Sequence, residues 1–243
     1  MVFNQVRFKK LAARVSLPPR KIVLVKSTLT PAHGVITARG VLNTASGKYH
    51  LDFLGKNLRA GDYARKQLQG LMRVHGAMDG HIPEKLPGIR GLFGNLSVKI
   101  SPVKFDRLEP VKNILAVIDP AYFGKNRLQG MRFQFLGGNF KIRNGKFRTT
   151  NLALKGEPLN IYLEGLYDAH TQQLDLRGKA LPKTGTGRAL QTSPQAARMV
   201  RKSRKRLVET HFTLEGPVSR PQMTLLGIRS KAPRKAKPSR PRR

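Results

Sequence analysis

Short segments in which apolar and polar residues alternate, separated by glycines and polar turns, limit most strongly what this chain can fold into. In the stretch from 131 to 182, Phe140 and Ile142 are each followed by a basic residue. A period of two sends successive side chains to opposite faces of a strand. The stretch therefore predicts β-strands that each have one apolar and one polar face.

Tight turns connect these predicted strands. Asn144-Gly145 favours a two-residue hairpin, because both residue types tolerate positive φ angles. A second polar turn is expected at 168–172, where Asp168 is a residue type common in turns. The apolar positions of the strands are Phe140, Ile142, Leu152, Leu154, Ile161, Leu163, Leu174 and Leu176, and the pairs Phe212 with Leu214 and Met223 with Leu225 extend the series. Strands joined in this way predict an antiparallel meander with one apolar face.

The region from 22 to 101 has the same character. Five strand-like segments follow one another: IVLVKSTL, GVITARGVL, KYHLDFLGKNLRA, RVHGAMDGHI and GLFGNLSVKI. Only Tyr63 to Met72 is predicted to be helical here, with Leu68 and Leu71 on one side. The fold class expected is mainly β: an antiparallel meander that forms an open, twisted apolar groove or a sandwich, with a few short amphipathic helices.

Two further helices are predicted. The first begins at Asp106, where Asp106 and Glu109 have capping-box spacing and Pro110 falls in the first turn. The second is signalled at Ser193-Pro194, with a thin apolar side formed by Ala197, Val200, Leu207 and Val208. Its other faces are almost wholly Arg and Lys.

The charge of the chain is strongly positive. It holds 47 Lys and Arg against 13 Asp and Glu, a formal net charge of +34. Nucleic acid and anionic lipid headgroups are plausible polyanionic neighbours for such a chain. The charge distribution predicts a basic N-terminal segment at 1–21, a β-rich domain at 22–228 and a disordered basic tail at 229–243.

The predicted basic helix has three interpretations. Its cations lie within nine residues: Arg198, Arg201, Lys202, Arg204, Lys205 and Arg206. Such a helix is a solvated charged surface, a face that lies on an anionic membrane, or a face that binds a phosphate backbone.

No residue pattern indicates catalysis, a metal or a cofactor. Cysteine is absent, and the six histidines show no HxxxH or HExxH spacing. The glycine-rich segment KTGTGRAL at 183–190 lacks the GK[ST] ending of a P-loop and is expected to be a flexible loop. We therefore expect a protein that is not an enzyme and binds no cofactor.

No stretch reaches the roughly 18 apolar residues of a transmembrane helix, and no secretory signal is recognised. The segment MVFNQVRFKKLAARVSL is rich in basic residues, like an organellar transit peptide. The alternative, which we prefer, is a chain that begins inside a longer gene product.

Several segments, taken in order, resemble the C-terminal region of the AsmA-like family of bacterial envelope proteins. They are GIRGLFGNLSVKI at 88–100, LEPVKNILAVID at 108–119, GMRFQFLGGNFKIRNGKFRTTNLALKG at 130–156, IYLEGLYDAHTQQLDLRGKALP at 161–182 and FTLEGPVSRPQM at 212–223. The likeness covers roughly residues 34 to 226. Family members are usually larger and carry an N-terminal inner-membrane helix, which is not found here.

The resemblance implies a non-catalytic, periplasmic β-groove, associated with the inner membrane, that supports phospholipid transport or outer-membrane biogenesis. Its partners would be phospholipid acyl chains, an anionic membrane surface, and an inner-membrane-anchored partner or missing N-terminal part. Acyl chains would lie on Phe140, Ile142, Leu152, Leu154, Ile161, Leu163, Leu174 and Leu176, although the same residues would equally form the core of a closed sandwich. The alternative function is a basic nucleic-acid-binding protein of ribosomal or nucleoid type.

Overall fold

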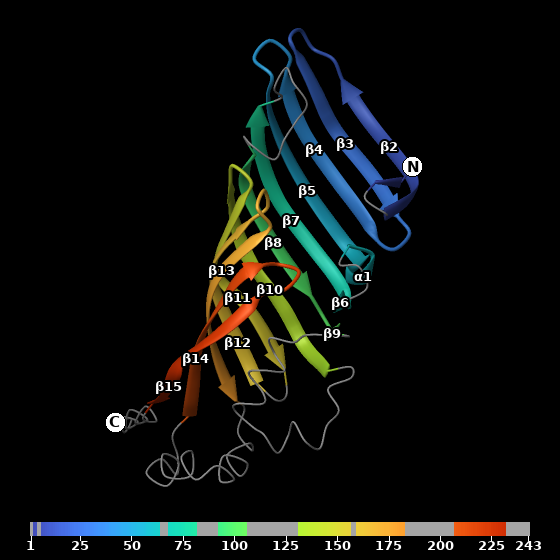
Figure 1. Ribbon diagram of the computed structural model, residues 1–243. Coiled ribbons are helices and arrows are strands. Elements are labelled where there is room, and N and C mark those ends of the chain that lie inside the picture. Colours follow the sequence, from blue (N-terminus) through green and yellow to red (C-terminus); the bar gives the residue numbers. More distant parts are fainter. Residues whose placement is uncertain are drawn as a thin grey trace, which may run out of the picture.

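A computed structural model describes residues 2–3, 6–63, 68–81, 92–105, 131–156, 159–182 and 207–231. These residues form one large, open, antiparallel sheet with almost no helix (Figure 1). The expected mainly-β meander is confirmed, and its open form distinguishes it from a closed sandwich of two packed sheets.

The first half of the sheet precedes residue 106. Its elements are β1 (Val2–Phe3), β2 (Val6–Ser16), β3 (Lys21–Pro31), β4 (Val35–Asn43), β5 (Lys48–Arg59), α1 (Ala60–Tyr63), β6 (Leu68–Gln69), β7 (Leu71–His81), β8 (Phe93–Ile100) and β9 (Val103–Phe105). The five strands expected between 22 and 101 correspond to β3, β4, β5, β7 and β8.

The second half consists of long strands joined by tight turns or by segments outside the described residues. Its elements are β10 (Met131–Arg143), β11 (Lys146–Gly156), β12 (Leu159–Asp168), β13 (Gln173–Pro182), β14 (Leu207–Pro217) and β15 (Gln222–Lys231). Asn144 and Gly145 have φ angles of 50° and 72°, as the predicted hairpin turn between β10 and β11 requires.

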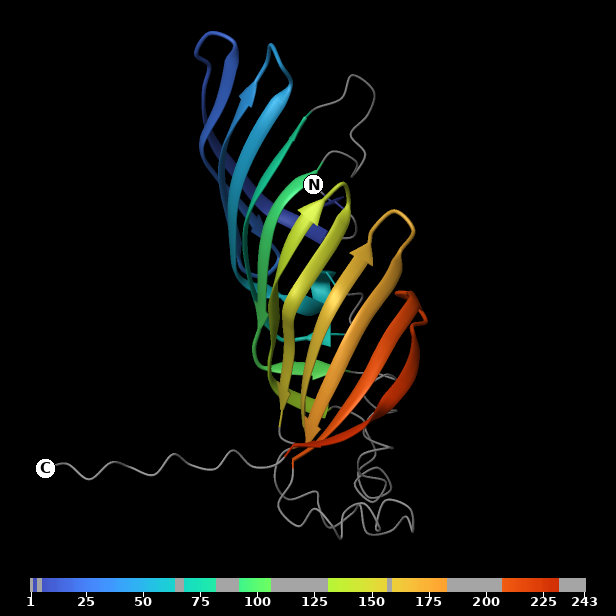
Figure 2. The same cartoon turned by 90° about the vertical axis from the view of Figure 1, so that its left-hand side faces the viewer.

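Neighbours in sequence are neighbours in the sheet. The strand order is β1-β2-β3-β4-β5-β7-β8-β10-β11-β12-β13-β14-β15, and the short β6 pairs with β9, which also pairs with β10. Figure 2 shows that the inclination of the strands changes steadily from the blue β2–β5 to the red β14–β15. The sheet is therefore twisted and open, with the two-residue β1 beside β2 at one end and β15 at the other.

The register assigns the side chains to two faces, because directly opposed residues in antiparallel strands point to the same side. Leu51 of β5 lies opposite Met78 of β7, and Leu96 of β8 lies opposite Phe140 of β10. We call the side that carries these residues the apolar face. The opposite side carries residues such as Arg39, Lys99 and Arg177 and is called the polar face.

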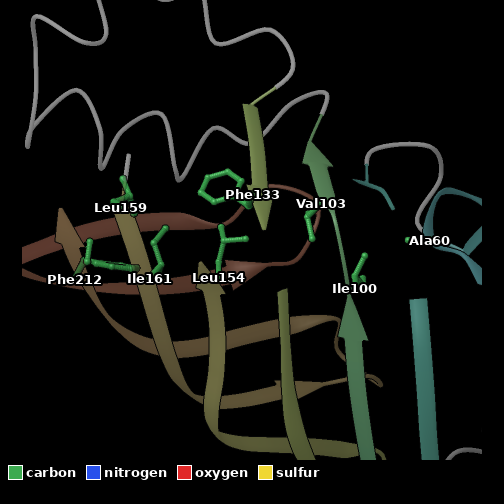
Figure 3. Packing of buried hydrophobic residues seen from close by; sticks show 9 residues of the cluster. Ala60, Ile100, Val103, Phe133, Leu154, Leu159, Ile161 and Phe212 are labelled. Carbon is green, nitrogen blue, oxygen red and sulfur yellow. The ribbon is translucent and has the colours of Figure 1, made fainter. Parts of the chain in front are cut away.

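Buried residues gather at one end of the apolar face, around β8 to β14. The cluster consists of Ala60, Ile100, Val103, Phe133, Leu154, Leu159, Ile161, Ala180 and Phe212. Figure 3 shows Leu154 of β11, Ile161 of β12 and Phe212 of β14 near one another in the cluster. This cluster is the best-packed part of the described molecule.

Two predicted helical segments are strands where they are described. Leu68 pairs with Phe105, and Leu71 pairs with Arg59, so the helix predicted at 63–72 is wrong for the described residues 68–72. Their spacing of three residues fits a helix, but pairing with existing strands outweighs that local preference. Leu207 and Val208, expected at the end of the basic helix, belong to β14.

Both ends of the described sheet extend beyond the β-rich domain predicted at 22–228. Residues Val6–Ser16 of the predicted basic N-terminal segment form β2. Arg229 to Lys231 of the predicted tail belong to β15, where Arg229 pairs with Glu209. The predicted helices at 106–118 and 193–206, the loop at 183–190 and residues 232–243 lie outside the described residues.

Candidate functional site

The structure places all eight predicted lipid-contacting residues on the apolar face. Leu154 lies opposite Ile161, and Leu152 lies opposite Leu163. Even-numbered β10 residues from Leu136 onward share that face, which places Phe140 and Ile142 there. Leu174 and Leu176 lie there as well, because they are paired with Tyr167 and Gly165, which share the face of Ile161 and Leu163 on β12.

The eight residues differ in how much of their surface they leave free. Ile142, Leu154, Ile161 and Leu176 are buried, with 3 to 6% of their surface exposed. Phe140, Leu152, Leu163 and Leu174 are half-buried. The first four are packed as a core, so the second four are the members of the predicted set with surface left for a ligand.

The same face continues over β3 to β8, where the described residues leave it largely uncovered. Phe53, Met78 and Leu96 are half-buried there, and so are Ile36, Leu42, Tyr49, Leu51, Met72, Val74 and Val98. These residues were not predicted as a site, although the alternation of Leu51 and Phe53 was visible. The sequence could not show that their strands continue the sheet of the second half.

At the β2 end, apolar side chains become exposed. Leu11 and Val15 of β2 are 61% and 49% exposed, and both lie opposite leucines of β3, Leu29 and Leu24. The apolar face therefore runs from a packed end at β10–β14 to an uncovered end at β2.

The six predicted anionic-surface-binding residues lie outside the described residues. They are Arg198, Arg201, Lys202, Arg204, Lys205 and Arg206. Their attachment to anionic membranes stays a prediction.

A group of charged side chains on the polar face links β4, β5 and β7. His50 lies between two carboxylates: its Nδ1 is 2.6 Å from Asp79 Oδ1, and its Nε2 is 3.4 Å from Asp52 Oδ1. Arg39 Nε donates to Asp52 Oδ2 at 3.1 Å. The hydrogen bond to Asp79 is the main cause that raises the pKa of His50 above its usual value, and the negative charges of both carboxylates add to it.

A second charged group surrounds Glu209 of β14. Its side chain is only 4% exposed and lies 3.8 Å from Lys179 Nζ and 3.3 Å from His211 Nε2. Burying a carboxylate is unfavourable unless it is paired, and these two neighbours supply pairing groups.

The predicted turn role of Asp168 is confirmed. Its Oδ1 accepts hydrogen bonds from the backbone N–H groups of His170, at 2.9 Å, and Thr171, at 3.4 Å. The bond from His170 is the main cause that lowers the pKa of Asp168. This carboxylate therefore stabilises the β12–β13 turn.

Two further features concern the described residues: grouped metal ligands and membrane-spanning helices. Within the described ranges, no three His, Asp or Glu side chains are grouped so that they could hold a metal ion together. Among the same residues, no helix has the length and apolar character needed to cross a membrane.

The chain was compared with known proteins in three ways. Neither protein-family models, nor curated proteins, nor solved structures gave a match.

Proposed function

We propose that this chain is a non-catalytic module of the bacterial envelope that holds phospholipid acyl chains on its apolar face and supports phospholipid transport or outer-membrane biogenesis. The proposal rests on the continuous apolar face and on the ordered resemblance to the AsmA-like C-terminal region. Its expected location is the periplasm, in association with the inner membrane.

The half-buried apolar face of β3 to β8, which no other described element covers, is the observation that carries the proposal. Monomeric proteins rarely expose large contiguous apolar surfaces, and such surfaces mark sites for an apolar partner. Its half-buried side chains are mostly aliphatic, with Tyr49 and Phe53 as the aromatic members. Acyl chains suit it, because each CH₂ group removed from water contributes about 0.8 kcal/mol.

The positive charge of the chain supports the same partner. Phospholipids in bacterial membranes carry phosphate, and each Lys or Arg near an anionic surface contributes about 1 kcal/mol of attraction. A formal net charge of +34 would bring the module to such a surface, while the apolar face would hold the chains. The same charge favours the alternative, a nucleic-acid-binding protein, so the experiment must separate the two.

A matched pair of leucines on one strand tests the proposal. Leu51 and Leu54 both belong to β5 and are both half-buried, but Leu51 lies on the apolar face opposite Met78, whereas Leu54 lies on the polar face opposite His75. Leu51→Asp places a charge where acyl chains would lie. Leu54→Asp makes the same change in chemistry on the other side of the sheet.

Phospholipid that co-purifies with the full chain would be measured by mass spectrometry after extraction. We expect phospholipid with the unchanged protein and with Leu54→Asp, and a loss of at least tenfold with Leu51→Asp. Circular dichroism would establish that both variants keep their β content. Protein that arrives free of lipid but retains DNA or RNA would reject the proposal and favour the nucleic-acid alternative.

A further inference from the structure

The polar face contains two hollows that meet. The first has a volume of about 800 Å³ and is lined by side chains of β8 and β10 to β15, including Lys99, Lys155 and Lys179. The second, also about 800 Å³, extends toward β4 and includes Arg39, Lys141 and Arg148. Both hollows are lined by Ser97, Asn139, Thr150 and Asn151. Together they form one elongated depression, which we call the basic trough.

A β-bulge lies where the two hollows meet. Between Thr149 and Leu152, β11 has one residue more than β12. Asn151 stabilises this irregularity, because its Oδ1 accepts a hydrogen bond of 2.8 Å from the backbone N–H of Asn139. Bulges bend a strand and redirect its side chains, and they are common beside functional sites.

Most cations of the basic trough have no acidic partner among the residues that the structure describes. Within the described part of the chain, no ion pair forms at Lys99, Lys141, Arg148, Lys155 or Arg177. Two of the three acids that line the trough are paired: Asp52 with Arg39, and Glu209 with Lys179. The third, Glu164, lies opposite Arg177 in the register. The trough therefore has an excess of free positive charge.

The neutral groups of the trough fit the same ligand class. Phosphate oxygens in protein complexes accept hydrogen bonds from Lys, Arg, Ser, Thr and Asn side chains. Ser97, Thr150 and Asn139 supply such groups at the centre, between the cations of the two hollows. An elongated depression with this lining suits a chain of phosphates better than a flat membrane.

Two aromatic rings on the polar side of the trough, Phe135 and Tyr162, already have cations over them. The ammonium groups of Lys99 and Lys155 lie 5.7 and 5.9 Å from the centre of the Phe135 ring, and Lys179 lies 5.7 Å from that of Tyr162. Gly137 also packs against the Phe135 ring, since a Cβ there would lie 2.8 Å from it. Stacking of bases, on which single-strand binders depend, would require these contacts to be broken.

We propose that the basic trough binds a linear phosphate polyanion through its phosphate groups. This site lies on the face opposite the proposed lipid site. Phe140 and Leu163 border both faces, but the cations and polar groups of the trough are not among the residues proposed to contact lipid. Recognition depends on the spacing of free cations along the trough, not on bases or on acyl chains.

Inorganic polyphosphate, titrated against the full chain over a range of salt concentrations, provides the test. The trough variant is Lys99→Gln with Lys155→Gln, and a second is Lys141→Gln with Arg148→Gln. The matched control, Lys21→Gln with Lys48→Gln, removes the same charge from exposed positions that line neither hollow. We expect each trough variant to weaken binding at least tenfold and to reduce the slope of log Kd against log salt by about two, on the order of one per lost contact. The control should change Kd less than about threefold, since it loses only long-range attraction.

Equal losses in trough and control variants would overturn the proposal, because attraction to the net charge alone would then explain binding. A single-stranded oligothymidylate with the same number of phosphates is the second probe. Similar affinity for both probes supports recognition of phosphate, whereas a more than tenfold preference for the oligonucleotide would show that bases are recognised and reject it. Leu51→Asp should leave polyphosphate binding unchanged, so this test can fail or succeed independently of the lipid test.

Discussion

His50 connects the charge state of a single residue to the stability of the sheet. Its contacts with Asp79 and Asp52 join β5 to β7 and are strongest when the imidazole is protonated. The raised pKa in the fold means that protonated His50 favours the folded state. This stabilisation is fully present below the ordinary pKa of 6.5 and is lost as pH rises through the higher pKa of the folded protein.

We predict a small drop in unfolding free energy as pH rises from about 6 to about 9, and His50→Gln should abolish it. The size should be at most about 1 kcal/mol, because the group is exposed and screened by water. Urea unfolding at both pH values measures it. His75→Gln is the control, since that exposed histidine of β7 has no ion pair among the described residues. An unchanged pH dependence in His50→Gln would contradict the prediction.

In three pairs of neighbouring strands, a glycine lies opposite a phenylalanine and leaves room for its ring. Phe53 lies opposite Gly76, Phe133 opposite Gly156, and Phe212 opposite Gly178, in each case across neighbouring strands. A Cβ at Gly178 would lie 2.3 Å from the end of the Phe212 ring, and one at Gly156 would lie 2.3 Å from the Phe133 ring. The rings therefore occupy the space above the glycines on the apolar face.

Gly178→Ala should destabilise the protein by about 1–3 kcal/mol, because Phe212 is 2% exposed and cannot move aside freely. Combining it with Phe212→Leu tests the cause. The shorter side chain would leave room for the new methyl group, so the double variant should lose less stability than the sum of the two single variants. Urea unfolding of the four proteins gives the coupling. Strict additivity would show that the ring and the glycine do not compete for space.

At the level of elements, the alternation of apolar and polar residues predicted most strands. It failed where pairing with a strand distant in sequence determines the structure. Phe140 with Ile142 and Ile161 with Leu163 predicted strands and a shared face, because period two is a local property. Leu68 was assigned to a helix, since its pairing with Phe105, distant in sequence, has no local signal. The charge of β2 concealed its alternation, and a register shift between Phe8 and Lys10 interrupts it.

The two candidate sites also differ in how far the sequence predicts them, because one depends on a local pattern and the other on long-range pairing. The apolar set required only alternation within each strand. The basic trough requires the register of several strands and the bulge at Thr150 and Asn151, which bring Lys99, Lys141 and Lys155 to one depression. No spacing along the sequence relates these three lysines.

Across the whole molecule, burial is distributed unevenly along the sheet. The buried cluster belongs to β8–β14 with Ala60 beside it, whereas every described side chain of β2 is exposed. Among the described elements, only the two-residue β1 lies on the outer side of β2, paired at Val6 and Arg7. An uncovered edge strand of this kind has little packing to hold its hydrogen bonds closed.

This gradient predicts the order in which the sheet opens. Backbone amides of β10 to β14 should exchange with deuterium slowest, because opening them disrupts the buried cluster around Phe133, Ile161 and Phe212. Amides of β2 and β3 should exchange at least about tenfold faster, since local opening there exposes little additional apolar surface. Hydrogen exchange followed by mass spectrometry of peptides from each strand measures both. Loading with phospholipid should slow exchange in β3 to β8 if acyl chains cover that part of the apolar face, while β10 to β14 would change little because their core is already packed. Uniform protection from β2 to β15 in the lipid-free protein would contradict this gradient and indicate that the sheet opens as a single cooperative unit.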